Sequence, residues 1–121
     1  MNINQSIFKA YDIRGIYPTD VDEHVSYNIG LAFANLITAE NPDKPIKILV
    51  ARDMRLSSLS LTQKVIKGLT DGGVDVLNIG LASTPTFYLA VSYFGTTGGI
   101  QISASHNPKE YNGFKMVRAN S

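Results

Sequence analysis

Residues 46–51 read IKILVA, a short apolar run that lies between Pro45 and the charged pair Arg52 and Asp53. An apolar run of this length, bounded by a proline and by charges, is typical of a strand that is buried on both faces of a sheet. Residues 74–79, VDVLNI, repeat the pattern after two glycines. Strands of this kind predict an α/β fold, in which helices cover both faces of the sheet.

Two more strands are predicted nearer the C-terminus, over residues 99–103 and 113–117. The polar segment between them contains Pro108 and Asn112, which favour turns. Strands that are separated by helices are expected to be parallel, with right-handed crossovers. Because no helix separates this last pair, an antiparallel arrangement is open to it.

Three helices are predicted, one before each of the first three strands. Their apolar residues recur at helical spacing over residues 25–36, 61–69 and 87–94, and we expect Phe33, Phe87 and Phe94 to lie in the core. The candidate residues for capping the helix starts are Asp20 or Asp22, Ser57 or Ser58, and Thr84. The pattern therefore predicts a three-layer α/β/α domain with a mixed, mainly parallel four-stranded sheet.

Composition excludes several classes of protein and of site. The chain has 121 residues, a formal net charge of +1 and no cysteine. The near-zero charge argues against nucleic acid or an anionic membrane as a partner, and the lack of cysteine excludes disulfides and a thiolate nucleophile. Residues 1–121 carry no linker-like stretch and no signal-peptide pattern. We therefore expect a single cytoplasmic domain.

The segment between the last two strands, residues 103–115, reads SASHNPKEYNGFK. It brings a hydroxyl, an imidazole, an amide and two ammonium groups close to a strand end, where ligands bind in open α/β sheets. One alternative is a polar connection that supplies turn geometry alone. Another is a hydrolase in which His106 activates Ser105, although adjacent residues seldom permit the required hydrogen bond. The glycines of residues 95–99 match a phosphate-binding loop only loosely.

Three spaced motifs resemble the α-D-phosphohexomutase superfamily, in its phosphomannomutase/phosphoglucomutase branch. SASHNP at 103–108, with YNGFK at 111–115, resembles the active-site serine loop of that superfamily. FKAYDIRG at 8–15 resembles the N-terminal motif of the branch, and RDMRLSS at 52–58 is similar to a turn of the family. The resemblance implies the first domain of an enzyme that interconverts hexose 1-phosphates and hexose 6-phosphates.

The resemblance implies roles for particular residues. Ser105 would carry a phosphoryl group, passing it to the sugar and recovering it from a bisphosphorylated intermediate. Arg14 and Lys115 would assist beside it, and Tyr11 and His106 would contact substrate. Because arginine is a poor proton shuttle, charge stabilisation suits Arg14 better, and Lys115 can act as an acid or base only with a lowered pKa. The alternative for Arg14 is a structural ion pair with Asp12 or Asp53.

The resemblance also predicts what lies outside this stretch. The family's Mg²⁺ is held by the serine phosphate and an aspartate-rich loop, and no such loop occurs here, so only Ser105 is predicted as a ligand. We expect domains 2–4 to be missing, the isolated chain to be inactive, and its exposed interdomain surface to favour self-association. A phosphoglucosamine mutase domain and a non-catalytic sugar-phosphate-binding module are the alternatives. Arg52, Asp53 and Arg55 are expected to form local ion pairs rather than to catalyse.

Overall fold

A five-stranded sheet forms the centre of the molecule, in a computed structural model that describes residues 12–119. The strand order is β1-β5-β4-β2-β3. The strands are β1 (Asp12–Ile16), β2 (Lys47–Arg52), β3 (Asp75–Leu81), β4 (Gly98–Ile102) and β5 (Tyr111–Arg118). β2 is parallel to both β3 and β4, whereas β5 is antiparallel to both β4 and β1. The predicted antiparallel arrangement of the last two strands is therefore confirmed.

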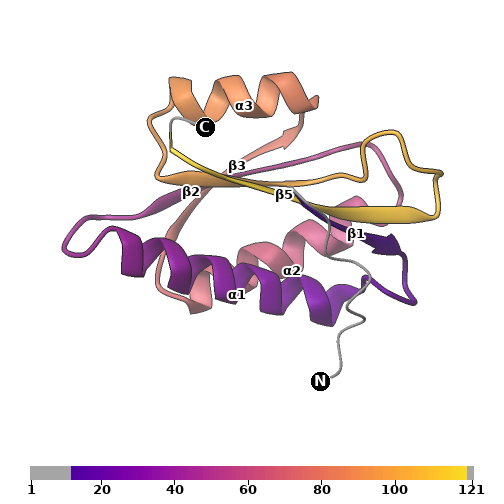
Figure 1. Cartoon of the computed structure of the whole chain (residues 1–121), viewed down its shortest axis with the longest axis horizontal. Helices are drawn as coiled ribbons and strands as arrows, with labels where there is room; N and C mark the ends of the chain where they lie inside the picture. The colour runs from indigo at the N-terminus through magenta and orange to yellow at the C-terminus, as the bar shows by residue number, and fades with distance from the viewer. Residues whose placement is uncertain (1–11, 120–121) are drawn as a thin grey trace.

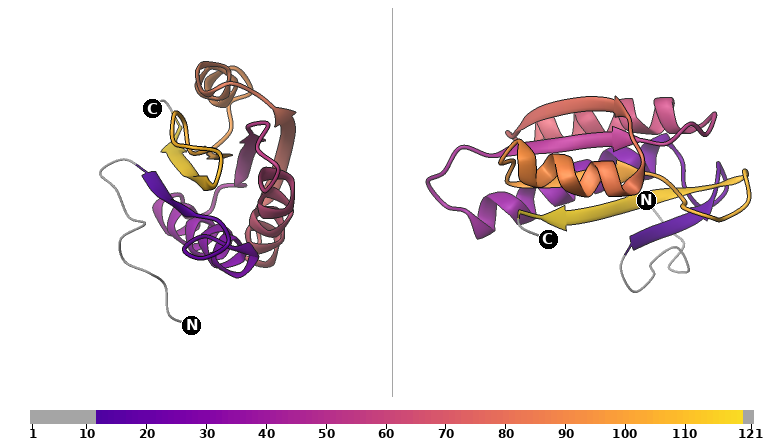
Figure 2. Two further views of the ribbon diagram at one scale, coloured as in Figure 1. Left: turned by 90° about the vertical axis from the view of Figure 1, so that its right-hand side faces the viewer. Right: turned by 90° about the horizontal axis from the view of Figure 1, so that it is seen from above.

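Helices cover both faces of this sheet (Figure 1). α1 (Glu23–Glu40) and α2 (Ser58–Asp71) lie together on one face, and α3 (Thr84–Tyr93) lies on the other. The view from the side in Figure 2 shows the same separation into three layers. The larger core lies between the sheet and the α1–α2 pair, and a smaller core around Phe87 lies beneath α3. The three-layer mixed α/β architecture is thus confirmed.

The predicted number of strands was wrong, because β1 makes a fifth strand at the edge of the sheet. Its sequence DIRGI does not look like a strand, since it places charged Asp12 and Arg14 among few apolar residues. It is held by pairing with β5, whose residues lie about a hundred positions later in the chain. With β1 included, parallel and antiparallel pairings are equal in number.

The helix starts were predicted with mixed success. Asp22 caps α1, because its Oδ1 accepts a hydrogen bond from the Val25 N–H at 2.9 Å. Ser83, and not Thr84, caps α3 by accepting from the Thr86 N–H at 3.3 Å.

The predicted core placement of Phe94 was wrong, because its side chain is 52% exposed. Further exposed apolar side chains occur at Met54, Leu56, Leu81, Leu89 and Tyr93, and self-association through them stays a prediction.

Two glycines allow α1 and α2 to pack at short range. A Cβ added at Gly30 would lie 2.3 Å from the Val65 carbonyl oxygen, and one at Gly68 would lie 2.1 Å from that of Tyr27. Both neighbours are backbone atoms, so any side chain at these positions would force the helices apart. The close contact fixes the start of α2 beside the ends of β2 and β4.

The parallel register of β2 and β4 brings two loops to one edge of the sheet. Arg52, at the end of β2, is paired with Ile102, at the end of β4. The turn from 53 to 57 and the loop from 103 to 110 therefore begin side by side.

No helix of residues 12–119 is long and apolar enough to cross a bilayer.

Candidate functional site

Ser105 lies in the loop that follows β4 and has an unusual backbone conformation. Its φ angle is +56°, in the left-handed region that residues other than glycine rarely adopt. Its N–H donates to Ser103 Oγ at 3.0 Å, and the Asn107 N–H donates to the Ala104 carbonyl at 3.1 Å. These bonds form a tight turn around Ser105. Such a conformation is retained only where surrounding contacts support it, and it is often found at functional sites.

Ser105 lines a cleft of about 750 Å³ at this edge of the sheet. Hydroxyl, amide, carboxylate and ammonium groups share the cleft with a few apolar side chains. Its lining residues are Tyr17, Asp53, Met54, Arg55, Leu56, Ser57, Ser60, Ser105, Asn107, Lys109 and Glu110. The volume suits a small polar molecule.

A buried carboxylate beside the loop joins two of the predicted cations. Asp12, whose side chain is only 2% exposed, pairs with Arg14 Nε at 3.0 Å and with Lys115 Nζ at 2.9 Å. Burial raises the pKa of Asp12, but the hydrogen bonds and positive charges of Arg14 and Lys115 outweigh it, so the net pKa lies below its usual value. The ion pair predicted as the alternative role for Arg14 is therefore present.

Arg14 also reaches the serine loop. Its Nη1 donates to Asn107 Oδ1 at 2.9 Å, so the guanidinium connects β1 with a residue two positions after Ser105. The register of β1 on β5 explains this placement, because Asp12 is opposite Lys115 and Arg14 is opposite Gly113. The structure thus groups Arg14 and Lys115 through Asp12, and joins this group to the serine loop through Asn107.

The remaining predicted site residues are placed differently. His106 is exposed at the outer part of the loop and is not among the residues that line the cleft. An exposed imidazole beside Ser105 in sequence gives no support to the hydrolase alternative. Tyr11 lies outside the described residues.

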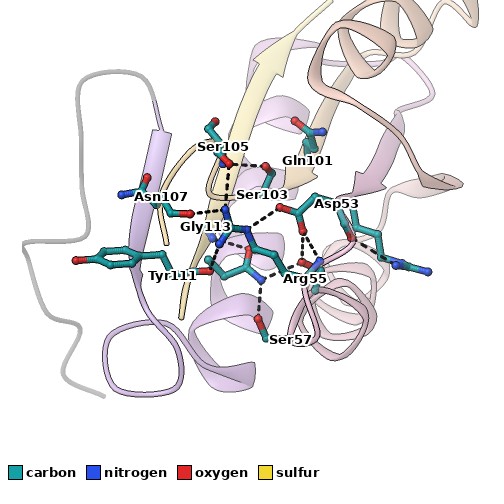
Figure 3. Close-up of polar contacts among 12 residues, drawn as sticks. Asp53, Arg55, Ser57, Gln101, Ser103, Ser105, Asn107, Tyr111 and Gly113 are labelled. Carbon is teal, nitrogen blue, oxygen red and sulfur yellow. Dashed lines mark hydrogen bonds and ion pairs between the residues drawn. The ribbon is translucent and has the colours of Figure 1, made fainter. Parts of the chain in front are cut away.

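Sequence reasoning missed the principal contact of the serine loop, which is made by Arg55. The predicted local pair exists, with Arg55 Nε donating to Asp53 Oδ2 at 3.0 Å. The two Nη groups, however, reach backbone carbonyls 50 to 56 positions away (Figure 3). Nη1 donates to the carbonyls of Pro108 and Tyr111 at 2.6 and 3.1 Å, and Nη2 donates to those of Ser105 and Asn107 at 3.0 and 2.8 Å. Only the position of Arg55 within the RDMRLSS motif hinted at a role beyond its own turn.

A second connection joins the same two segments. Asn112, which is fully buried, donates through Nδ2 to Ser57 Oγ at 2.7 Å and to Ser58 Oγ at 2.9 Å. Ser58 in turn donates to Asp53 Oδ1 at 2.5 Å. The start of α2, the turn before it and the serine loop therefore form one hydrogen-bonded unit.

The carboxylates near Ser105 bear on whether this part of the chain can hold a metal ion. Within residues 12–119, no group of three or more histidine, aspartate or glutamate side chains could hold a metal ion. The two aspartates of the region are already paired, Asp12 with Arg14 and Lys115, and Asp53 with Arg55. Coordination of Mg²⁺ through a phosphate on Ser105, with its other ligands outside this stretch, stays a prediction.

Comparisons with known proteins agree with the fold and the motifs. Residues 5–121 match the family model described as phosphoglucomutase/phosphomannomutase, alpha/beta/alpha domain I. A phosphomannomutase of Klebsiella pneumoniae is 46% identical over 114 residues, which cover 94% of this chain and 69% of the relative. A phosphomannomutase of Escherichia coli is also 46% identical, but the match covers only 24% of its length.

A solved structure shows the same arrangement. The crystal structure of a phosphoglucomutase/phosphomannomutase family protein from Burkholderia thailandensis has a TM-score of 0.90 and 41% identity to this chain. The match covers 99% of this chain and 27% of that protein. The chain thus spans about a quarter of the Escherichia coli and Burkholderia proteins. It belongs to the phosphoglucomutase/phosphomannomutase family, as its α/β/α domain I.

Proposed function

We propose that Ser105 is the phosphate-carrying residue of a phosphohexomutase that acts on mannose or glucose phosphates. The observation that carries the proposal is the placement of Ser105 in a left-handed turn on the cleft, beside a guanidinium bound to Asn107. In the loading step, Ser105 Oγ forms a bond to phosphorus while the bond from phosphorus to the sugar oxygen breaks. The serine proton ends on the released sugar hydroxyl. In the opposite step, phosphorylated Ser105 passes its phosphoryl group to the free hydroxyl of a hexose monophosphate and takes up the proton of that hydroxyl, which forms the bisphosphate. Loading from the other position of this bisphosphate then completes the interconversion.

Arg14 is suited to stabilise charge during this transfer. Phosphoryl transfer spreads negative charge over the equatorial oxygens, so positioned cations are the main catalytic requirement. Arg14 Nε is held by Asp12 and Nη1 by Asn107, whereas Nη2 has no hydrogen-bond partner among the described residues. The side chain is 32% exposed, which leaves that nitrogen accessible to a phosphate oxygen.

Lys115 and His106 are the other two candidates for contact with the transferred phosphate. Lys115 Nζ donates to Asp12 and its side chain is 15% exposed, so it is held close to Arg14. His106 is exposed and can turn toward a bound sugar phosphate. We assign to Lys115 the role of a second cation and to His106 a contact with the substrate phosphate. Tyr11 is proposed as a substrate contact on its motif alone.

Mass spectrometry of the intact chain tests the proposal. Incubation with glucose 1,6-bisphosphate should add one phosphoryl group, and Ser105→Ala should abolish it. Ser92→Ala, which alters an exposed serine of α3, should label like the wild type. Label that survives Ser105→Ala would contradict the assignment, and saturable binding of the bisphosphate without any label would favour a non-catalytic binding module.

Turnover is a separate question, because the chain spans only a quarter of most relatives named above. We expect no detectable conversion of glucose 1-phosphate or mannose 1-phosphate by this chain with Mg²⁺ present. A coupled assay for the 6-phosphate product measures it. Robust turnover would show that residues 1–121 suffice for both phosphoryl transfers.

A further inference from the structure

The hydrogen bonds of Arg55 account for its whole guanidinium. An arginine side chain has five N–H donors in a fixed plane. Here Nε donates to Asp53, Nη1 donates to the carbonyls of Pro108 and Tyr111, and Nη2 donates to those of Ser105 and Asn107. Five donors therefore meet five acceptors. The side chain is 13% exposed, so these bonds are largely shielded from water.

The four carbonyls that Arg55 binds belong to one short loop. They come from residues 105 to 111, the segment that carries Ser105 between β4 and β5. Carbonyl oxygens that converge on one point repel each other unless a cation or donor lies between them. The guanidinium removes that repulsion and, through the Ser105 carbonyl, supports the disfavoured φ angle of +56°.

The same bonds exclude a direct role for Arg55 with substrate. Arg55 lines the cleft, as a phosphate-binding arginine would, but it has no N–H left for a phosphate oxygen. Arg14 differs, because its Nη2 has no partner among the residues described. Of these two arginines, only Arg14 keeps a nitrogen that can approach a ligand without breaking a hydrogen bond within residues 12–119.

We propose that Arg55 is a positioning residue for phosphoryl transfer, which holds the Ser105 loop in its reactive shape through the carbonyls of residues 105–111. The proposal rests on the proposed function, since it takes Ser105 as the phosphate carrier. Asp53 orients the guanidinium: its Oδ2 accepts from Nε, and its Oδ1 accepts from the Arg55 backbone N–H at 3.1 Å. Lysine cannot substitute, because an ammonium has three donors and no plane.

Loading of Ser105 from glucose 1,6-bisphosphate, followed by intact mass over time, measures the effect. Arg55→Lys and Arg55→Met should lower the maximal loading rate about 10- to 100-fold, because a displacement of about 1 Å at the reacting atom has an effect of that size. The bisphosphate concentration at half-maximal rate should change less than about twofold, since Arg55 does not bind the donor. Rates are taken per folded molecule, with the folded fraction measured by circular dichroism.

Arg52 offers a matched control in the same turn. The one hydrogen bond that its side chain makes among the described residues is a long one, from Nη1 to the Asp53 carbonyl at 3.5 Å. Arg52→Lys and Arg52→Met should load at the wild-type rate. Hydrogen exchange supplies a readout that needs no phosphate: amides of residues 105–111 should exchange faster in Arg55→Lys and be unchanged in Arg52→Lys.

The outcomes separate the two proposals. If the wild-type chain is labelled on Ser105 and Arg55→Lys loads equally fast, the positioning role is wrong while the proposed function stands. A raised half-saturating concentration at an unchanged maximal rate would also overturn it, because Arg55 would then bind the donor. If the wild-type chain takes no label, the proposed function fails and the positioning role with it. Should Arg55→Met not fold, Arg55→Lys decides.

Discussion

Two arginines approach the Ser105 loop from opposite sides, and their surroundings differ. Arg55 comes from the turn after β2 and has all five N–H groups bound to the protein. Arg14 comes from β1, the edge strand three places from β2 in the sheet, and keeps one nitrogen without a partner among the described residues. Saturated donors suit a residue that holds a loop, and an incomplete set suits one that meets a ligand. The residue type alone cannot distinguish these roles.

The largest loss of stability is expected from Asp12→Asn, which changes the ion pairs around Arg14. This change removes the buried carboxylate that Arg14 and Lys115 share, and it leaves two neighbouring cations without a counter-charge. We expect the free energy of unfolding to fall by about 3 kcal/mol, the size found when one partner of a buried pair is removed. Urea denaturation measures it. Asp75→Asn, at an exposed position of β3, is the matched control and should stay within about 0.5 kcal/mol of the wild type.

A smaller loss of stability is expected from Asp53→Asn, which removes the ion pair of Arg55. The amide can no longer pair with Arg55, but four carbonyls still hold the guanidinium. We therefore expect about 2 kcal/mol less stability, together with faster hydrogen exchange in residues 105–111. A loss greater than that of Asp12→Asn would reverse the ranking of the two sides and would show that the carbonyls contribute little.

Acid should selectively weaken the ion pairs that Asp12 forms with Arg14 and Lys115. The pKa of Asp12 in the folded chain lies below its ordinary value of 3.8, so its stabilising contribution is complete above about pH 4 and is lost as the pH falls through the lowered pKa. The stability difference between wild type and Asp12→Asn should therefore shrink as the pH falls from about 4 through the lowered pKa, because a protonated Asp12 resembles asparagine. Urea denaturation of both chains at each pH measures it. A difference that stays constant over this range would mean that the charge of Asp12 does not stabilise the fold.

The smallest change in stability is expected from Arg52→Gln. Arg52 lies three positions before Arg55, but its hydrogen bond to the Asp53 carbonyl is 3.5 Å long. We expect a change in unfolding free energy within about 0.5 kcal/mol. If thermal denaturation showed a loss as large as that of Asp53→Asn, the turn as a whole, rather than Arg55, would hold the loop.

Most of the fold was predictable because its signals are local. The strand at 46–51 and those at 74–79, 99–103 and 113–117 are found within two residues of the predicted bounds, since short apolar runs between turns identify buried strands. β1 was not predicted, because its buried Asp12 is balanced in part by Lys115, which lies 103 positions away. Phe94 was misplaced because helical spacing reports a helix face but cannot tell where the facing layer ends.

The site was predictable only in part. The family motifs indicated Ser105, Arg14 and Lys115, and the structure groups the two cations around Asp12. The family motifs gave no reason to connect Arg55 with Ser105. Hydrogen bonds to backbone carbonyls do not depend on the side chains of the accepting residues, so they leave no pattern in the sequence. The carbonyls that accept from Arg55 belong to residues of several types, so only the folded chain reveals the contact.

The position of β1 has a consequence for the order in which the chain can fold. β1 bonds only to β5, so the first described strand remains unpaired until residues 111–118 have been synthesised. β2, β3 and the helix α2 between them contain mainly nearer contacts and can associate earlier. Arg14 and Lys115 therefore meet only in the last stage of folding. A nascent chain that is released early would contain a partly formed sheet but would lack the group of Asp12, Arg14 and Lys115.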